Sequence, residues 1–440
     1  MDHRWSTAIL EEIDSSRDEL VELLRQLVSF PSVTGQEGDI QAYIVERLRA
    51  EELEVDTWEP NLKELQEHPA FVPSPQSFDG RPNVVGRWPG TGGGRSLLLN
   101  GHVDVIPPGP SGAWTGGPWG GAIEGTRMYG RGTSDMKSGL AAMIVSVTAL
   151  RRLGYQPRGD LTLEFTVDEE ATGNGTLACV LRGHQASAGI CCETSSLEVQ
   201  PACIGRIWFT TEVPGRSAGI QRSWEGVNAI EKGYEIVKSI AALGDRRIAS
   251  CSHPLYPDVR SSIPCMVCVF EAGSFPSAFP DQCVLRGSIA TLPGEETDGV
   301  KAAFLRHIEA RCNEDPWLSK HPAQTRFDGY CGDPAEIDPN HPIVRTLQAQ
   351  FETATGRQPR ITGRQGAADT RYLIRYGDTP TVIFGPGNTS QMHAANEWVD
   401  IEDLVTATKA LALTVADWCS GGEAGDGRAN PPPGGQAGRG

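Results

Sequence analysis

The chain has 440 residues, more than one ordinary domain, and its length suits two or three domains. Apolar residues make up 39% and charged residues 22%, so a sizeable core is possible and global disorder is excluded. The 39 basic and 56 acidic residues give a formal charge of −17, which argues against binding to nucleic acid or to anionic membranes. The sequence contains no run of 18 apolar residues, so no membrane span is predicted.

The N-terminal residues and the cysteines both indicate a cytoplasmic protein. The first residues lack a basic segment followed by an apolar one, so no secretory signal is expected. Eleven cysteines are an odd number and lie scattered, which favours free buried thiols over a disulfide framework. Cys265 and Cys268 have the spacing of a redox or zinc pair, but no second pair accompanies them and their surroundings predict a strand.

The first 205 residues alternate between predicted helices and strands. In chain order these are a helix over 6–30, a helix over 38–53, a strand at 53–58, an inserted loop at 59–82, a strand at 96–100, a glycine- and proline-rich loop at 107–121, a helix over 139–153 and a strand at 160–167. Such alternation is typical of an α/β domain whose mostly parallel sheet is flanked by helices.

The pattern changes after about residue 205, where a smaller unit is predicted. It comprises a strand at 207–213, a helix over 226–243, strands at 266–270 and 283–291, and a helix over 296–312. We interpret residues 206–323 as a small αβ sandwich inserted between two parts of one catalytic domain, 1–205 and 324–419. The second part has predicted elements at 342–355, 379–384 and 401–419. Residues 420–440 consist mostly of glycine, proline, alanine and charge, so a disordered tail is expected.

Five short segments concentrate histidine and carboxylate residues at predicted strand ends or in glycine-rich loops. They are Gly101–Asp104, Tyr129–Gly139, Val167–Glu170, Cys192–Thr194 and Met392–Glu397. Open α/β sheets place ligand sites at strand ends. Nitrogen and oxygen donors without thiolates suit Zn²⁺, Co²⁺ or Mn²⁺. Each segment alone also fits an ordinary polar turn or a helix cap, so the metal hypothesis depends on the whole set.

Two of these segments have chemistry that points to cations. His102 and Asp104 point the same way at strand periodicity, and a carboxylate beside a histidine can aim its other ring nitrogen at a metal. Asp168, Glu169 and Glu170 are consecutive carboxylates, which repel one another unless a cation lies among them.

In this order the motifs resemble those of the M20 metallopeptidase family, over residues 20–415. That family includes acetylornithine deacetylase, succinyl-diaminopimelate desuccinylase and glutamate carboxypeptidase. The motifs are Gly-His-x-Asp-Val, Gly-Arg-Gly-x-x-Asp-Met-Lys, Asp-Glu-Glu-x-x-Gly, Glu-Thr and His-x-x-Asn-Glu. The resemblance implies a catalytic domain of the di-zinc peptidase type, a small-molecule substrate, and an inserted lid that forms a homodimer.

The resemblance also implies a ligand set for two divalent ions, with zinc expected and cobalt or manganese as alternatives. His102 would bind one ion and His393 the other, and Asp135 would bridge both. Glu193 would complete the site of His102, and Glu170 the site of His393.

Two further residues receive catalytic roles from the resemblance. Asp104 would orient His102, and Glu169 would be the general base. The peptide bond after Asp135 is often cis in this family. Two cations sharing one carboxylate lower the pKa of a water towards about 7, and Glu169 could then carry its proton to the leaving nitrogen.

The predicted lid departs from the family in three places. Gly219 stands where a histidine that stabilises the oxyanion is expected, Ala290 where an arginine grips a substrate carboxylate, and Ser277 where an asparagine is common. Subfamily variation or an alignment misplaced by a residue or two would explain this. A substrate without an α-carboxylate would explain it too, because alanine cannot make the bidentate contact of arginine. The cations that could substitute are Arg216, Arg222, Arg260 and Arg286.

The sequence therefore predicts a dinuclear metal amidohydrolase that removes an acyl or formyl group from a small N-acyl amine or amino acid. Alternatives of the same family are a carboxypeptidase or dipeptidase, and hydrolysis of another C–N bond such as that of an aromatic amine. A non-catalytic binding protein descended from such enzymes is the alternative of another class. The retained Glu169 argues against it, because a binding protein has no need of a base among metal ligands.

Overall fold

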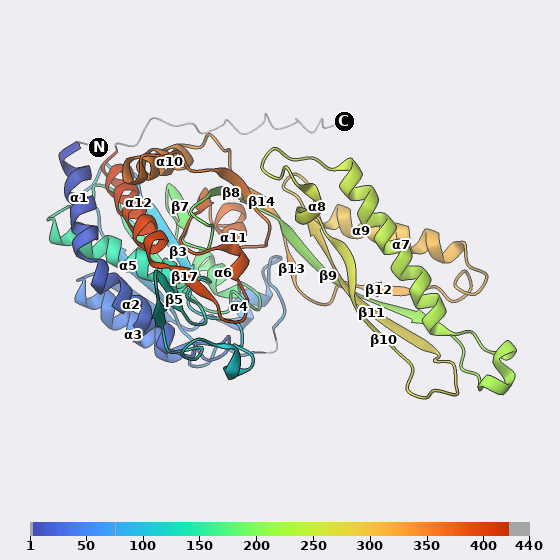
Figure 1. The fold of residues 1–440 in the computed structure, drawn as a ribbon. Helices are drawn as coiled ribbons and strands as arrows, with labels where there is room; N and C mark the ends of the chain where they lie inside the picture. Colours follow the sequence, from blue (N-terminus) through green and yellow to red (C-terminus); the bar gives the residue numbers. More distant parts are fainter. Residues whose placement is uncertain (1–2, 75, 422–440) are drawn as a thin grey trace, which may run out of the picture.

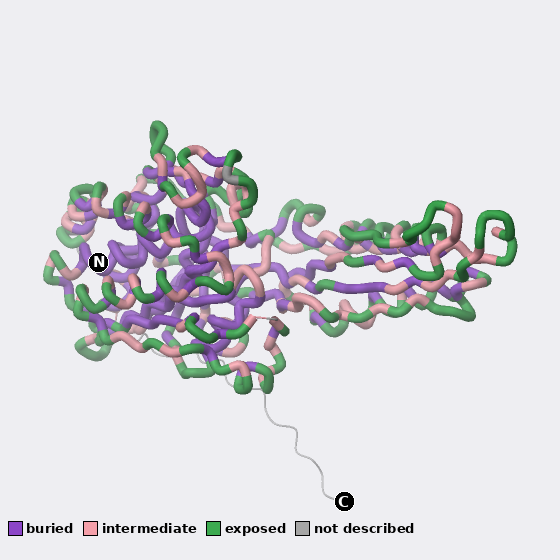
Figure 2. The backbone as a smooth tube through the Cα atoms, turned by 90° about the horizontal axis from the view of Figure 1, so that it is seen from below, coloured by how far each residue is buried: buried purple, intermediate pink, exposed green. Residues whose placement is uncertain are grey.

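The computed structural model describes residues 3–74 and 76–421, so nearly all of the predicted tail at 420–440 lies outside the described residues. The chain forms two lobes (Figure 1), and a larger lobe holds both ends of the described chain. An elongated second lobe extends from one side of it, and the view turned by 90° in Figure 2 shows the same extension. Buried residues are concentrated in the larger lobe.

A nine-stranded sheet forms the centre of the larger lobe. Its order is β1-β2-β6-β3-β7-β16-β8-β14, with β15 beside β8. The strands are β1 Glu54–Trp58, β2 Asn83–Trp88, β3 Leu97–His102, β6 Leu161–Thr166, β7 Ala188–Cys191, β8 Val199–Cys203, β14 Ala335–Glu336, β15 Ile361–Arg364 and β16 Thr381–Ile383.

The middle of this sheet is parallel, as the alternating sequence pattern predicts. Strand β3 pairs in parallel with β6 and β7, and β16 pairs in parallel with β7. Every residue of β3, β6 and β7 is buried, because helices cover both faces of a parallel sheet. The outer strands β1, β2 and β14 are antiparallel to their neighbours.

Helices surround the sheet, and the larger lobe also contains a small three-stranded sheet. The helices are α1 His3–Ser15, α2 Arg17–Ser29, α3 Gly38–Ala50, α4 Leu62–Gln66, α5 Lys137–Arg152, α6 Asn174–Leu181, α10 Pro342–Thr355, α11 Thr370–Arg375 and α12 Ile401–Ser420, with 3₁₀ turns η1 Ser111–Ala113 and η3 Thr389–Gln391. The small antiparallel sheet joins β4 Ala122–Glu124, β5 Arg127–Tyr129 and β17 Trp398–Asp400.

Helix α5 comes close to the loop after β7, and Gly139 makes this possible. A Cβ atom at Gly139 would lie 1.9 Å from the carbonyl oxygen of Cys192, so a larger residue would push α5 away.

The single helix predicted over 6–30 is two helices, because Ser16 departs from helical geometry with ψ near 6°. Apolar spacing continues across that break, so periodicity alone could not detect it.

The second lobe contains a five-stranded antiparallel sheet of order β10-β11-β9-β12, with β13 also beside β9. Its elements are β9 Gly205–Pro214, η2 Ile220–Glu225, α7 Ala229–Ser250, α8 Val259–Ser262, β10 Cys265–Ala272, β11 Gln282–Thr291, α9 Thr297–Asn313, β12 Gln324–Arg326 and β13 Cys331–Gly332. Helices α7 and α9 pack on one face through Phe209, Ile236, Leu285 and Phe304. The pairing of β12 and β13 extends this sheet beyond residue 323, where the sequence predicts the lid to end.

The remaining expectations concern cysteines and membranes. All eleven cysteines are free, and Cys265 and Cys268 lie on strand β10 with one side chain buried and the other exposed. Among the described residues, no helix has the length and apolar composition that a membrane crossing requires.

Candidate metal centre

The five chemistry-bearing segments meet at one edge of the large sheet. His102 is the last residue of β3 and lies opposite Thr166, the last residue of β6. Glu169 and Glu170 follow β6, so they emerge at the same edge. Glu193 follows β7, the other neighbour of β3. This juxtaposition results from parallel pairing, because parallel strands end on the same side.

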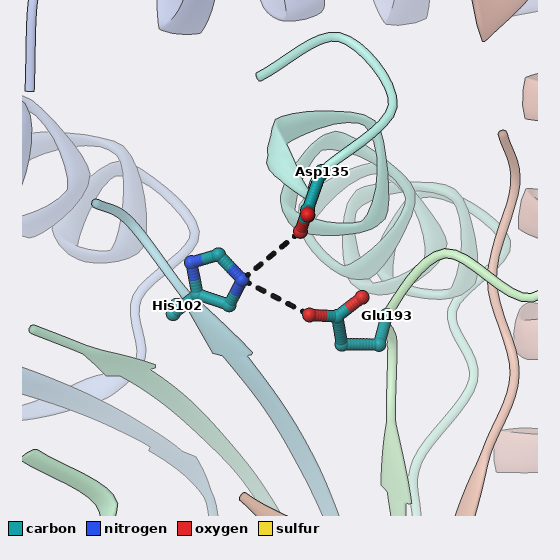
Figure 3. Close-up of side chains that lie close together, drawn as sticks. All are labelled: His102, Asp135 and Glu193. Atoms are coloured by element: carbon teal, nitrogen blue, oxygen red, sulfur yellow. Dashed lines mark hydrogen bonds and ion pairs between the residues drawn. The ribbon is translucent and has the colours of Figure 1, made fainter. Parts of the chain in front are cut away.

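A first group of possible metal ligands surrounds the His102 ring (Figure 3). His102 Nε2 lies 3.0 Å from Glu193 Oε1 and 3.3 Å from Asp135 Oδ1. All three residues are buried, and their ligand atoms lie within 4.8 Å of one another.

A second group shares Asp135 with the first. His393 Nε2 lies 2.8 Å from Glu170 Oε2 and 3.5 Å from the other Asp135 oxygen, Oδ2. These three ligand atoms also lie within 4.8 Å of one another. One oxygen of Asp135 thus faces each group, which is the arrangement of a carboxylate that bridges two ions.

The loop that presents Asp135 is held by Glu397. The Glu397 carboxylate accepts hydrogen bonds from the backbone N–H groups of Gly132 at 3.0 Å, Ser134 at 2.7 Å and Asp135 at 2.9 Å. The Arg131 guanidinium donates a fourth at 2.7 Å. The Asp135–Met136 peptide bond is cis, as the family resemblance implies.

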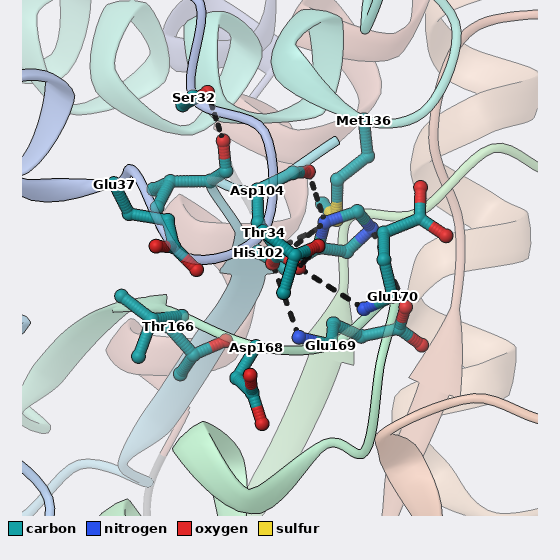
Figure 4. Close-up of polar contacts among 12 residues, drawn as sticks. Ser32, Thr34, Glu37, His102, Asp104, Met136, Thr166, Asp168, Glu169 and Glu170 are labelled. Carbon is teal, nitrogen blue, oxygen red and sulfur yellow. Dashed lines mark hydrogen bonds and ion pairs between the residues drawn. The ribbon is translucent and has the colours of Figure 1, made fainter. Parts of the chain in front are cut away.

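Asp104 lies behind the first group and links it to the Glu169–Glu170 segment (Figure 4). Its carboxylate accepts hydrogen bonds from the backbone N–H groups of Glu169 and Glu170, both at 3.1 Å, and from the Thr34 hydroxyl at 2.8 Å. His102 Nδ1 lies 2.9 Å from the backbone oxygen of Asp104 and 3.6 Å from its carboxylate. These contacts direct Nε2 of His102 towards the other candidate ligands.

The three consecutive carboxylates have separate surroundings. Asp168 points away from the two groups and pairs with Arg81, which also pairs with buried Glu37. Glu170 belongs to the second group. The side chain of Glu169 is 16% exposed, and its carboxylate reaches to 3.9 Å from His102 Nε2. Burial raises the pKa of Glu169 well above its usual range.

Charges around the two groups are strongly interdependent. Burial, with Asp135 nearby, raises the pKa of Glu170 to about 7, and the hydrogen bond to Glu170 raises the pKa of His393 to about 9. Burial opposes ionisation of Glu193, yet Arg364 and His102 lower its pKa to about 2. Nη2 of Arg364 donates to Glu193 Oε2 at 3.0 Å and leaves Oε1 to face His102.

The donor set fits two divalent ions. Asp135 Oδ1 is buried and has no hydrogen-bond partner among the described residues, although it faces a histidine nitrogen. Buried carboxylates gathered this closely need compensating positive charge, which a pair of cations supplies. Imidazole and carboxylate donors without thiolate suit zinc, cobalt or manganese.

The lid positions singled out by the sequence lie apart from these groups. Ala290 is fully buried beside Tyr256, and Gly219 lies in the loop before η2. Of the four cations considered as replacements, Arg222 and Arg286 pair with nearby glutamates, Arg216 lies over the Trp317 ring, and Arg260 is exposed on α8.

Sequence reasoning missed several residues that shape this site. They are Arg364, Thr34, Arg206 and Trp208. Arg206 lies directly opposite Ala290 in the β9–β11 register and lines a cavity that also includes Glu169 and Glu170. The Gly205-Arg206 dipeptide at the start of the first lid strand could have drawn attention to Arg206. Only the pairing of β9 with β11, however, places this arginine opposite Ala290.

The strand-end site and the α/β fold define a metal-dependent hydrolase, and comparison with known proteins gives the family. The sequence model of peptidase family M20/M25/M40 matches residues 98–417, nearly three quarters of the chain. The chain belongs to this family, as the five motifs predict. Its relatives hydrolyse amide bonds, and the chain is an amide-bond hydrolase of the same kind.

Individual relatives include two deacylating enzymes. The chain is 29% identical to N-formyl-4-amino-5-aminomethyl-2-methylpyrimidine deformylase of Halalkalibacterium halodurans, with 93% of this chain and 97% of that protein covered. It is 28% identical to succinyl-diaminopimelate desuccinylase of Rhodopseudomonas palustris, with 72% of this chain and 80% of that protein covered.

A solved structure shares the fold. It is the YXEP protein of Bacillus subtilis, described as a dinuclear metal binding peptidase of the M20 family, with a TM-score of 0.63 at 14% identity and coverage of 92% and 98%.

Proposed function

We propose that the protein is a dinuclear metal-dependent amidohydrolase that removes a formyl or other small acyl group from a small amine. The observation that carries this proposal is the sharing of Asp135 between two ligand groups, one with His102 and Glu193, the other with His393 and Glu170. Zinc is the proposed metal, with cobalt and manganese as alternatives. The similarity to a deformylase over nearly the whole chain supports removal of a formyl group.

The residues beside the two groups have complementary tasks. When bound, two divalent ions supply polarisation of the scissile carbonyl and lower the pKa of a water towards about 7. Glu169 lines the cavity beside the ligands and belongs to neither group. The charge of two bound ions would lower its raised pKa and keep the carboxylate ionised, so that it could accept a proton from water. It then delivers this proton to the leaving amine. Asp104 holds the backbone of Glu169 and Glu170 and orients His102.

The substrate is tested with matched pairs. The zinc-loaded protein is assayed on N-formyl amines, on the corresponding N-formyl amino acids, and on dipeptides. Because Ala290 replaces the arginine expected for a substrate carboxylate, we expect amines lacking the α-carboxylate to compete well, with a preference of up to about a hundredfold. Hydrolysis of dipeptides alone would refute the deformylase proposal and favour a dipeptidase. A strong preference for the α-carboxylate would show that another cation has replaced the missing arginine.

The second lobe is also the proposed homodimer contact. Strand β10 is an edge strand with exposed Met266 and Phe270, and α7 beside it exposes Tyr234. Edge strands with apolar side chains favour pairing with another chain. Sedimentation at micromolar concentration should give twice the mass of the chain, and Phe270→Glu should weaken the dimer. A wild-type monomer would contradict this proposal.

The cytoplasm is the proposed location of the protein.

A further inference from the structure

The sheet of the second lobe carries a tryptophan on the face that α7 and α9 leave open. Trp208 lies on β9 opposite Ser288 of β11, and its backbone N–H donates to the Tyr330 carbonyl oxygen at 2.8 Å. The Trp208 side chain is 53% exposed, whereas its neighbours Ile207 and Phe209 are buried against the helices. Trp208 and the exposed Val269 line the same cavity on this face, so the indole belongs to a hollowed apolar surface, and such surfaces mark binding sites.

Two cavities meet at Trp208. One, of about 400 Å³, is lined by Glu169 and Glu170 on the catalytic side and by Trp208, Ser288 and Tyr330 on the lid side. The other, of about 580 Å³, continues along the open face of the lid sheet and is also lined by Trp208 and Ser288. Trp208 therefore lies where the space beside the proposed base passes into the lid.

The walls around Trp208 combine aromatic surface with hydrogen-bond donors. The Tyr330 ring lies 5.9 Å from the Trp208 ring. Gly329 packs against the indole, and a Cβ atom there would lie 3.1 Å from Trp208 carbons. Arg206 lines the same cavity, with Nη1 3.5 Å from the Ser288 hydroxyl. No ion pair joins Arg206 to a carboxylate in the part of the chain that the structure describes.

We propose that this cavity binds the amine half of the substrate as a planar heteroaromatic ring that stacks on Trp208. Arg206 and Ser288 then donate hydrogen bonds to a ring nitrogen or another acceptor on the ring. The inference rests on the proposed deacylase function and specifies its substrate class. The acyl group faces Glu169 and the ring faces the lid, because the cavity joins these two surfaces. Stacking explains why an exposed indole lies where the two cavities meet.

The first test compares three N-formyl substrates that differ in the amine. They are the formylated 4-amino-5-aminomethyl-2-methylpyrimidine, N-formylbenzylamine and N-formylbutylamine. Trp208→Ala should lower kcat/KM about 10- to 100-fold for both ring substrates, the typical loss of a base–aromatic stack, and change it less than about twofold for the butyl substrate. Trp208→Phe should retain most of the ring preference. Equal losses on all three substrates would overturn the stacking role.

Two further variants separate the roles of individual residues. Arg206→Met should weaken turnover of the pyrimidine about tenfold or more and leave the benzyl substrate nearly unchanged, because a benzene ring offers no acceptor. Trp224→Ala is the matched control, since Trp224 is 76% exposed and lines neither cavity. An effect of Trp224→Ala equal to that of Trp208→Ala would overturn the assignment of the cavity.

Binding of the free amine distinguishes failure of this inference from failure of the proposed function. Calorimetry of the zinc-loaded protein with 4-amino-5-aminomethyl-2-methylpyrimidine should show binding that Trp208→Ala weakens about 10-fold or more. If wild type binds this amine through Trp208 but hydrolyses no formamide, the proposed function fails and the ring site stands. If formamides are hydrolysed but the amine binds both proteins equally or not at all, the ring site is wrong.

Discussion

Glu397 is not itself a candidate ligand, yet its replacement by glutamine should disrupt both ligand groups. The buried carboxylate accepts three backbone hydrogen bonds from the loop that carries Asp135 and pairs with Arg131 at 2.7 Å. The Arg131 and Glu397 side chains are 4% and 0% exposed, so solvent cannot replace the lost contacts. A glutamine keeps one accepting oxygen and turns an NH₂ group towards donors.

The expected magnitude follows from this burial. Breaking a buried ion pair costs about 3–5 kcal/mol of unfolding free energy, and we expect Glu397→Gln to lose about that amount. Because Asp135 faces both groups, metal affinity should fall about 10- to 100-fold, as it does when supporting contacts of ligands are removed. Denaturant unfolding of the metal-free protein and competitive zinc titration measure the two effects separately.

Glu402→Gln provides a matched control on the same part of the chain. Glu402 pairs with Arg17 at the surface, with side chains 62% and 39% exposed, and such pairs contribute less than about 1 kcal/mol. The control should therefore retain its stability and its zinc affinity. If Glu397→Gln lost no more stability and no more zinc affinity than Glu402→Gln, the proposed support of Asp135 would be refuted.

Three further predictions concern the ligands, the base and a buried acid. His102→Ala and His393→Ala should each lower metal content below two ions per chain and abolish hydrolysis; unchanged metal content in both, measured by elemental analysis, would exclude this ligand set. Glu169→Gln should keep its metals and lose about 10²- to 10⁴-fold in kcat, so near-normal turnover would exclude Glu169 as the proton carrier. Burial raises the pKa of the Glu164 carboxyl from 4.5 to about 8. Between pH 4.5 and 8 this carboxyl is protonated in the folded protein and ionised in the unfolded chain. The free energy of unfolding therefore falls as the pH rises through this range. Glu164→Gln should reduce this pH dependence of the free energy of unfolding, measured by denaturation at a series of pH values. An unchanged pH dependence would contradict the raised pKa of Glu164.

Local sequence was sufficient to place the candidate ligands near one another. His102, Glu170 and Glu193 each follow an apolar run that predicts a strand, and parallel pairing of those strands brings their ends together. Short elements were harder, because β8, α6 and α11 have too few residues to show a clear period. The break at Ser16 was missed because apolar spacing continues through it.

Contacts between distant parts of the chain account for what the sequence did not reveal. Arg364 lies 171 residues from Glu193, and Arg81 lies 87 residues from Asp168, so no local pattern could show which carboxylates meet a cation. These long-range pairs decide that Asp168 turns away while Glu170 joins His393. Likewise, Arg206 and Ala290 become neighbours only through strand register.

The sequence by itself determined the family, the α/β class and the residue types gathered at one sheet edge, because strand periodicity and strand-end motifs are local properties. Tertiary structure decided which oxygen of each carboxylate faces which histidine, because that depends on packing and charge from remote segments. It also decided that an open sheet face of the lid lies across a cavity from Glu169, with Trp208 between them. The proposed ring site depends on that cavity, whose walls come from separate parts of the chain.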